Sequence, residues 1–525
     1  MKKSLMCLAS LALVSGLRAA VPEPVKTDAG LLSGTAGASP GVRVFKGIPF
    51  AAPPVGELRW RAPQPVARWT GVRKAEKFGA VCVQPKGVGR QNIAVDLPDS
   101  PAANEDCLYL NVWTAARSAS ERRPVMFWIY GGAYTEGGGS SPHTDGEALA
   151  RKGVVVVSFN YRLGPFGFFS HPELTKESGH NASGNQALMD TIAALRWMQT
   201  NIAAFGGDPR NVTIFGESAG AAMAAGLVGS SQAAGLFRRA ISESGAWMGL
   251  TMAAMRTRQQ AEQPAGRRGG PAPVLMPLAE LRGKSADELA RTFSGAGMIA
   301  DGWIIPEDES VTFAQGRQQP IDVLVGSNKD EGSFAPDTPA EAWTNRVRQR
   351  WGDLADDYLK LYPAGSGEEA TRSGRTAFRD ELAWHMRLYA STQSKRGNRA
   401  YWYFFTHEPP YPQDVRNLKT THATEIPYVF DNLRQPRVFP DTSSPELAAA
   451  SAPDRALAER MSLYWVNFAR TGDPNGNGLP RWPAFSDASP APMILGEIDE
   501  TPDPQRLAIY DKLYAKTLAT IGRRP

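Results

Sequence analysis

The chain has 525 residues, of which 42% are hydrophobic and 21% are charged, so its composition is that of a globular protein with a large core. The formal net charge is +5, and leaving out Lys2, Lys3 and Arg18 near the N-terminus reduces it to +2. So small a charge argues against a protein that binds nucleic acid through a basic surface, and we expect no nucleic-acid partner.

The first twenty residues are typical of a secretion signal. A pair of lysines precedes an apolar run over residues 5–17, and the small residues Ala19 and Ala20 follow it. This run is too short to cross a membrane as a helix, and no later stretch of the sequence approaches twenty apolar residues. We therefore expect a signal peptide at residues 1–20, cleaved near Ala19 and Ala20, a secreted or periplasmic protein with no membrane partner, and a single domain over residues 21–525.

Two cysteines remain after the leader, Cys82 and Cys107. An even number of cysteines in a chain sent to an oxidising compartment favours a disulfide. The segment between them is polar, contains prolines and has no aromatic residue and no histidine. We predict that Cys82 and Cys107 form a disulfide that closes this segment into a loop.

The strands are predicted mainly from short, nearly continuous apolar runs, which are typical of strands covered on both faces. Residues 25–50 have the pattern of an antiparallel start, whereas the proline-rich residues 51–69 indicate irregular backbone. Further strands are expected at residues 106–113, 125–130, 154–159, 211–216, 237–244, 320–326 and 401–405.

Helical spacing of apolar residues follows several of these strands. Helices are predicted over residues 185–205, directly after Ser218, over 340–361 and over 455–471. Buried strands that alternate with helices predict an α/β fold with a large, mostly parallel sheet. Residues 256–277 are rich in Gln, Arg, Gly, Pro and Ala, so we expect an exposed insertion there.

The motif Gly216-Glu217-Ser218-Ala219-Gly220 joins a β-branched run to an alanine-rich helix. A serine at such a junction is exposed on a strained turn, and the two flanking glycines let the strand and the helix approach closely. The N–H of Ala219 then lies at a helix N-terminus, where it can stabilise a developing negative charge. We interpret Ser218 as a nucleophile, although a serine that caps a helix would have the same local sequence.

A second match to G-x-S-x-G lies at residues 37–41, with Ser39 at its centre. No strand-like run leads into this copy, and Pro40 has no N–H to offer an oxyanion. A residue that precedes proline is also disfavoured in helical geometry. We interpret Ser39 as part of a surface turn.

A serine nucleophile needs a histidine as its base, and the histidine needs a carboxylate that orients it. In hydrolases of this strand-turn-helix type the order along the chain is serine, acid, histidine, which leaves His385, His407 and His422 as candidates. Asp330 and Glu331 follow a predicted core strand, and either could be the acid by spacing alone.

His422 lies three residues before Glu425, a spacing that can suggest metal ligands. No second histidine or cysteine accompanies the pair, so we expect neither a metal site nor a cofactor.

The run Gly131-Gly132-Ala133 directly follows a predicted buried strand. Its small residues allow backbone N–H groups to approach a tetrahedral intermediate, so we predict further oxyanion donors there. An ordinary glycine-rich turn is the alternative.

These motifs together resemble the type B carboxylesterases, the cholinesterase-like branch of the α/β-hydrolases, over about residues 25–515. The resemblance extends to other segments, namely Phe45-Lys46-Gly47-Ile48-Pro49-Phe50-Ala51, Leu58-Arg59-Trp60, Glu105-Asp106-Cys107-Leu108-Tyr109-Leu110-Asn111-Val112, Trp128-Ile129-Tyr130-Gly131-Gly132-Ala133, Asn160-Tyr161-Arg162-Leu163-Gly164 and Phe205-Gly206-Gly207-Asp208-Pro209.

The resemblance implies an α/β-hydrolase fold and a role for particular residues. The family's acid falls on Glu331 and its histidine on His422, and its first disulfide falls on Cys82 and Cys107. The resemblance also implies that the oxyanion donors are Gly132, Ala133 and Ala219. It places Glu217 and Glu425 at positions that support the histidine electrostatically, and Ser244 in the Ser-Gly segment behind the site.

The sequence also departs from the family's cholinesterases. They carry a tryptophan in the first disulfide loop that stacks on a quaternary ammonium, and this loop has no aromatic residue, which argues against choline recognition. The later disulfides of animal members are missing as well, which is more typical of a bacterial secreted enzyme.

We therefore expect a secreted serine carboxylesterase that hydrolyses a small-molecule ester, such as a bulky natural-product ester or an aryl ester, through an acyl-enzyme. It would work as a monomer or a weak homodimer. The alternatives are an amidase or lipase, and a non-catalytic binding protein that reuses the fold.

Overall fold

The computed structural model describes residues 21–84, 102–263, 274–295, 297–411, 416–433 and 450–521. The predicted signal peptide lies outside these residues, and so does the centre of the predicted insertion. In the part of the chain that is described, no helix is long and apolar enough to cross a membrane.

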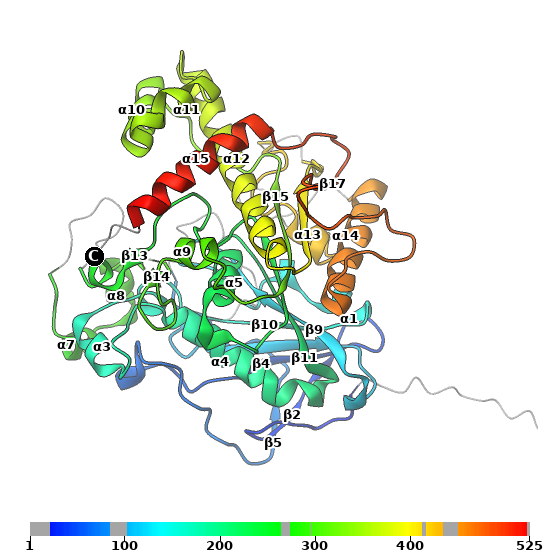
Figure 1. Cartoon of the computed structure of the whole chain (residues 1–525). Coiled ribbons are helices and arrows are strands. Elements are labelled where there is room, and N and C mark those ends of the chain that lie inside the picture. The colour runs from blue at the N-terminus through cyan, green and yellow to red at the C-terminus, as the bar shows by residue number, and fades with distance from the viewer. Residues whose placement is uncertain are drawn as a thin grey trace, which may run out of the picture.

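A ten-stranded sheet forms the centre of the described structure, in the order β17-β16-β15-β12-β11-β9-β10-β8-β4-β3 (Figure 1). The strands from β17 to β10 in this order are parallel, whereas β8 is antiparallel to both β10 and β4. The strands of the sheet are β3 (Thr35–Ala36), β4 (Arg43–Pro49), β8 (Tyr109–Thr114), β9 (Arg123–Ile129), β10 (Val155–Phe159), β11 (Gly207–Glu217), β12 (Arg239–Glu243), β15 (Asp322–Asn328), β16 (Ala400–Phe405) and β17 (Met493–Leu495).

Three small sheets or ladders accompany the large one. A three-stranded sheet combines β1 (Val25–Lys26), β2 (Leu31–Ser33) and β5 (Val72–Lys74), and two-stranded ladders pair β6 (Val81–Cys82) with β7 (Ala103–Asn104) and β13 (Arg256–Thr257) with β14 (Ile299–Ala300). The antiparallel pairs β1–β2 and β3–β4 agree with the start predicted for residues 25–50.

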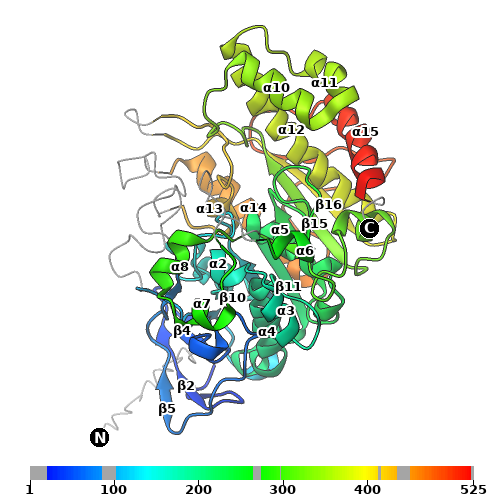
Figure 2. The same ribbon diagram turned by 90° about the vertical axis from the view of Figure 1, so that its left-hand side faces the viewer.

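Helices cover the large sheet. α5 packs on β11 and β12, α12 packs on β15 and β16, and α14 packs on β9 and β11. In both views α10 and α11 lie at the opposite end of the molecule from β2 and β5 (Figures 1 and 2). The described helices are α1 (Glu147–Arg151), α2 (Gly164–Gly167), α3 (Pro172–Glu177), α4 (Gln186–Asn201), α5 (Ala219–Gly229), α6 (Arg258–Ala261), α7 (Leu278–Gly283), α8 (Ala286–Thr292), α9 (Glu309–Ala314), α10 (Ala340–Trp351), α11 (Ala355–Leu361), α12 (Gly367–Ser394), α13 (Ile426–Val429), α14 (Ala452–Thr471) and α15 (Pro504–Ile521).

The local sequence explains why the central strands form. β10 and β16 are buried along their whole length, and β9 is buried at every position after Arg123. Strands covered by helices on both faces need apolar residues at successive positions, and the apolar runs in the sequence have this pattern. The prediction of a mostly parallel α/β sheet is confirmed.

The parallel strands bring their carboxyl ends to one edge of the sheet. β9 leads to Gly131, β11 to Ser218, β12 to Ser244 and β15 to Glu331. Loops at this edge are where open α/β sheets place their ligands, so the topology alone gathers the candidate residues.

Residues 256–261 form the start of the expected exposed insertion. They form β13, which pairs in parallel with β14, and the short helix α6 with a capping box at Thr257 and Gln260. Gln259 and Gln260 are exposed, so this described part of the expected insertion lies at the protein surface.

The structure joins Cys82 and Cys107 in a disulfide, as predicted, across a sequence separation of 25 residues. Both cysteines are buried, and Cys107 lies just before β8 of the large sheet. The bond therefore ties the ladder of β6 and β7 to the central sheet.

Replacing both Cys82 and Cys107 with serine is expected to lower the free energy of unfolding by about 3 kcal/mol, because a closed loop of this length restricts the unfolded chain. Equilibrium denaturation of the variant and the oxidised parent would measure the difference. Parent protein treated with reductant should behave like the variant, and equal stability of all three samples would contradict the prediction.

Candidate active site

Ser218 stands on a sharp turn between β11 and α5. Its backbone has φ 54° and ψ −122°, a strained conformation that any side chain at this turn must adopt. A Cβ at Gly216 or Gly220 would collide with the carbonyl oxygen of Ile129 on the neighbouring strand, so both positions need glycine. The turn predicted from the G-x-S-x-G motif is therefore present in the structure, and the alternative of a simple helix cap does not apply, because Ser218 makes no side-chain capping bond.

The histidine loop and the acid loop meet beside this turn. His422 Nδ1 lies 2.6 Å from Oε2 of Glu331, which is fully buried. Oε1 of Glu331 accepts hydrogen bonds from Ser244 Oγ at 2.6 Å and from the Asn328 N–H at 2.8 Å. A carboxylate held by three donors orients the imidazole so that Nδ1 carries a hydrogen and Nε2 is left to receive a proton.

Nε2 of His422 faces Glu217, with 3.1 Å between Nε2 and Oε1. This distance is that of an ion pair, but the geometry is not aligned for a hydrogen bond, and Nε2 has no hydrogen-bond partner among the described residues. Because Glu217 directly precedes Ser218, this contact places the His422 ring beside the Ser218 turn, so the predicted nucleophile, base and acid lie in one region of the structure.

The other two candidate histidines, His385 and His407, have different surroundings. His385 is fully buried against Trp247, with 4.7 Å between ring centroids, and burial lowers its pKa to about 3. His407 contacts Glu497 through Nδ1 and Asp454 through Nε2, both at 2.7 Å. Neither imidazole contacts Glu331, so the choice that spacing left open falls on His422.

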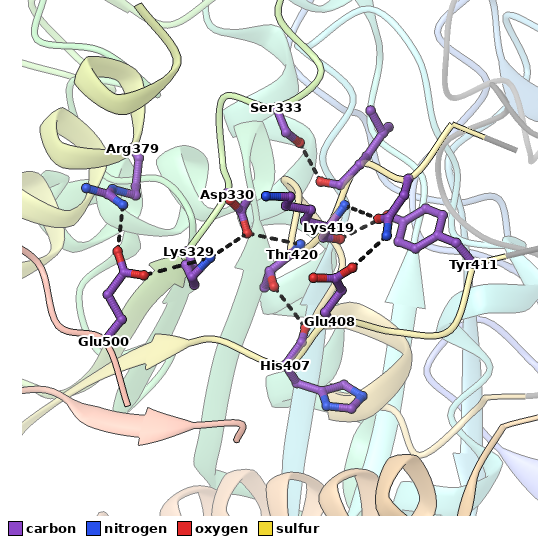
Figure 3. Close-up of polar contacts among 12 residues, drawn as sticks. Lys329, Asp330, Ser333, Arg379, His407, Glu408, Tyr411, Lys419, Thr420 and Glu500 are labelled. Carbon is purple, nitrogen blue, oxygen red and sulfur yellow. Dashed lines mark hydrogen bonds and ion pairs between the residues drawn. The ribbon is translucent and has the colours of Figure 1, made fainter. Parts of the chain in front are cut away.

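Asp330 has a different environment from its neighbour Glu331. Its N–H donates to the carbonyl oxygen of Thr420 at 3.0 Å, and its Oδ2 lies 3.2 Å from Lys329 Nζ and 3.4 Å from the N–H of Thr420 (Figure 3). Lys329 also lies 3.8 Å from Glu500. Asp330 therefore fastens the acid loop to the histidine loop and does not contact His422.

The segment after β9 contacts the nucleophile turn. A Cβ at Gly131 would lie 3.0 Å from Ser218 Cβ and 2.8 Å from the Glu217 carbonyl oxygen. Gly132 and Ala133 both have positive φ, 106° and 51°, which turns their peptide groups out of the strand geometry. In the described part of the chain no hydrogen bond engages the N–H groups of Gly132, Ala133 or Ala219, so these three donors are free to receive an oxyanion.

Several buried carboxyl groups surround the histidine. Burial raises the pKa of Glu217 to about 8 and raises the pKa of Glu243 well above its ordinary value. Burial alone would lower the pKa of His422, but the carboxyl groups of Glu217 and Glu331 outweigh it and raise the pKa to about 9. Glu217 and His422 influence each other, because the carboxyl group of Glu217 lies 3.1 Å from Nε2 and its charge favours the imidazolium.

Comparison with known proteins identifies the family. The sequence profile of the carboxylesterase family matches residues 22–513. The chain belongs to this family. It is a type B carboxylesterase, an enzyme that hydrolyses carboxylic esters, and it has the α/β-hydrolase fold.

Relatives of this carboxylesterase include two bacterial enzymes. It is 36% identical to a fumonisin B1 esterase of Sphingopyxis macrogoltabida, over 87% of this chain and 84% of the relative. It is also 36% identical to a para-nitrobenzyl esterase of Bacillus subtilis strain 168, over 92% of this chain and 96% of the relative.

Solved structures agree with this relationship. A PNB esterase structure has a TM-score of 0.76 at 33% identity, covering 93% of this carboxylesterase and 99% of that chain. A carboxylesterase of Geobacillus stearothermophilus has a TM-score of 0.75, also at 33% identity, with the same coverage.

Asn328 is the residue in the site of this carboxylesterase that the sequence did not point out. It is the last residue of β15, fully buried, and its side chain donates to the carbonyl oxygen of Thr421 at 2.8 Å and to Glu425 Oε2. The available signal was a polar amide at the carboxyl end of a core strand, three residues before the acid. Within the described ranges, no three His, Cys, Asp or Glu residues are placed to hold a metal ion.

Replacing Glu217 with glutamine is expected to extend the activity of the carboxylesterase to lower pH. The carboxyl group of Glu217 raises the pKa of His422, and an imidazolium cannot act as a base. Glutamine carries no charge, so the pKa of His422 and the acidic limb of kcat/KM should both move to lower pH. A pH–rate profile would test this, and identical acidic limbs in parent and variant would contradict it.

Proposed function

We propose that this carboxylesterase is a secreted serine esterase that works through an acyl-enzyme, with Ser218 as nucleophile, His422 as general base and acid, and Glu331 as the orienting carboxylate. The observation that carries the proposal is the 2.6 Å contact between His422 and Glu331 beside the strained turn of Ser218. The residues are buried, so their electrostatic interactions are little screened by water.

In the proposed reaction Ser218 Oγ attacks the ester carbonyl carbon while Nε2 of His422 takes the hydroxyl proton. The N–H groups of Gly132, Ala133 and Ala219 stabilise the oxyanion, and Glu331 stabilises the imidazolium. The tetrahedral intermediate collapses when His422 gives the proton to the leaving alcohol. Water then attacks the acyl-enzyme by the same steps, which releases the acid and restores Ser218.

For the substrate we propose a bulky natural-product ester or an aryl ester. Aromatic rings lie near the site: the ring centroid of Phe334 is 6.1 Å from that of His422, and Tyr134, which directly follows Ala133, has its ring centroid 5.0 Å from that of Phe168. Such surfaces favour large apolar or aromatic groups. The names of the fumonisin B1 and para-nitrobenzyl relatives are consistent with this class.

A panel of purified esters tests the proposal. We expect kcat/KM to be higher for aryl and bulky alkyl esters than for acetyl esters of small alcohols, because the aromatic surfaces contribute binding in the transition state. Matched amides should be hydrolysed far more slowly. A flat profile over acyl and alcohol size would contradict the proposed substrate class, and faster amide hydrolysis would identify an amidase.

We also propose that residues 1–20 direct export and are then removed. Mass spectrometry of the protein recovered from a bacterial periplasm or medium should show a chain that begins near Val21. An intact N-terminus in a protein that stays in the cytoplasm would contradict the proposal.

A further inference from the structure

Two buried carboxyl groups, Glu331 and Glu425, face the same hydroxyl group. Ser244 Oγ lies 2.6 Å from Glu331 Oε1 and 3.2 Å from Glu425 Oε1. Both glutamates are fully buried, as is the serine. A hydroxyl group carries one hydrogen, so Ser244 can donate fully to one carboxyl group only, and the shorter contact assigns that hydrogen to Glu331.

Asn328 determines which oxygen of Glu425 is an acceptor. Its Nδ2 faces Glu425 Oε2 and the carbonyl oxygen of Thr421, and since a carbonyl oxygen can only accept, the amide nitrogen must point this way. Oε2 of Glu425 therefore accepts a hydrogen bond. Oε1 is left opposite the oxygen of Ser244, whose hydrogen points to Glu331, so this contact is a hydrogen bond only if Glu425 supplies the hydrogen.

We propose that Glu425 is a neutral carboxylic acid in the working enzyme, and that Asn328 is the positioning residue that orders its proton. The hydrogen bonds then converge on Glu331: Glu425 donates to Ser244, Ser244 donates to Glu331, and His422 donates to Glu331 from the other side. This inference rests on the proposed triad, and it changes the role expected for Glu425 from a second negative charge to a hydrogen-bond donor.

The surroundings of Glu425 favour the neutral form. Burial and the charge of Glu331 raise its pKa to about 7, although the amide of Asn328 and the charge of His422 act in the opposite direction. Among the described residues, the titratable groups that interact with Glu425 are Glu331, His422, Glu217, Glu243 and Tyr403. Only His422 among them can be a cation, and it is already paired with Glu331.

A neutral Glu425 matters for catalysis because of the charge on the base. A second ionised carboxylate behind Glu331 would stabilise the imidazolium further. It would raise the pKa of His422 and so disfavour proton transfer from His422 to the leaving alcohol. It would also compete with Glu331 for the hydrogen of Ser244. With Glu425 protonated, Glu331 keeps three donors and remains the one acid that compensates the imidazolium directly.

Glu425→Gln and Glu425→Ala form the first test. Glutamine resembles the protonated acid, because its NH2 group can donate to Ser244 while its oxygen accepts from Asn328, so kcat/KM at pH 6–8 should stay within about fivefold of the parent. Alanine removes one hydrogen-bond partner from Ser244 and one from Asn328, and should reduce kcat/KM by more than about thirtyfold. A glutamine variant as impaired as the alanine variant would overturn the proposal, since it would mean that the charge is needed.

Asn328→Asp forms the second test. The aspartate has the same shape but no hydrogen to donate when ionised, so kcat/KM relative to the parent should fall by about a hundredfold at pH 8. At pH 5.5 the aspartate can carry a proton, and most of the relative loss should be recovered. Asn201→Asp is the matched control, because Asn201 is as deeply buried and bonds to Asp28 and Trp197. Equal pH profiles for the parent and Asn328→Asp would overturn the role of Asn328.

Thermal stability gives a readout that does not depend on ester turnover. A carboxyl group whose pKa is higher in the folded protein contributes stability at low pH and loses it as the pH rises through about 7. Glu425→Gln has no such loss, so its melting temperature relative to the parent should be higher at pH 8 than at pH 5. A difference that does not change with pH would overturn the neutral assignment, whereas a parent that hydrolyses no ester would refute the proposed function alone.

Discussion

Replacing Ser218 with alanine is expected to lower kcat for ester hydrolysis by about 10⁵-fold and to leave the fold intact. The loss is large because the acyl-enzyme cannot form without Oγ, and His422, Glu331 and the N–H donors then have no nucleophile to act on. Stability should change little, since Ser218 makes no side-chain capping bond and alanine has to adopt the same strained φ of 54°.

The measurement is steady-state turnover of a chromogenic ester together with trapping by an organophosphate. Mass spectrometry should find one phosphoryl adduct on the parent and none on Ser218→Ala. Ser39→Ala is the matched control, because Ser39 is the serine of the other G-x-S-x-G match and lies in the turn between β3 and β4, where Val42 donates to its carbonyl oxygen at 3.3 Å. Turnover at the parent rate in Ser218→Ala would refute the mechanism.

The central sheet and the nucleophile turn could be predicted because each depends on residues that are close together in the sequence. The continuous buried runs of β9 and β10 indicate that helices cover both faces of the sheet. Gly216 and Gly220 indicate that the turn at Ser218 packs closely against Ile129. Local sterics and burial determine such features, so they can be recognised in a single sequence.

The choice between Asp330 and Glu331 shows where local reasoning ends. Both residues follow β15, and nothing in their spacing separates an acid that orients the base from one that ties two loops together. The structure separates them through contacts far apart in sequence: Glu331 meets His422 and Ser244, whereas Asp330 meets Thr420. The resemblance to the family selected Glu331 because the acid of the family is the glutamate of an Asp-Glu-Gly segment, which falls on residues 330–332.

The full extent of the long helix α12 could not be predicted, for a similar reason. It extends over 28 residues, but its buried face carries charged side chains such as Asp380 and Glu381, which hide the apolar pattern of an amphipathic helix. Asp380 contacts Arg379 and Arg506, and Glu381 contacts Arg350. Most of these partners are distant in sequence, so the sequence pattern alone could not show that such charges are tolerated inside.

Replacing Glu331 with glutamine is expected to reduce kcat/KM by about 10³–10⁴-fold. Oε1 of Glu331 accepts from Ser244 and Asn328, and Oε2 accepts from His422. A glutamine has one acceptor oxygen, so its NH2 group must face at least one of these donors and the imidazole loses its orientation or its support. The variant also lacks the negative charge that stabilises the imidazolium in the transition state.

The pH profile of Glu331→Gln distinguishes this mechanism from simple unfolding. The charge of Glu331 helps to raise the pKa of His422 to about 9, so the acidic limb of the residual activity should move to lower pH when that charge is removed. Asp330→Asn is the matched control: it removes a charge one residue away that contacts Thr420 and Lys329 (Figure 3), and kcat/KM should fall by less than about tenfold without a shift of the limb. A larger loss in Asp330→Asn than in Glu331→Gln would instead identify Asp330 as the acid that orients His422 through a hydrogen bond.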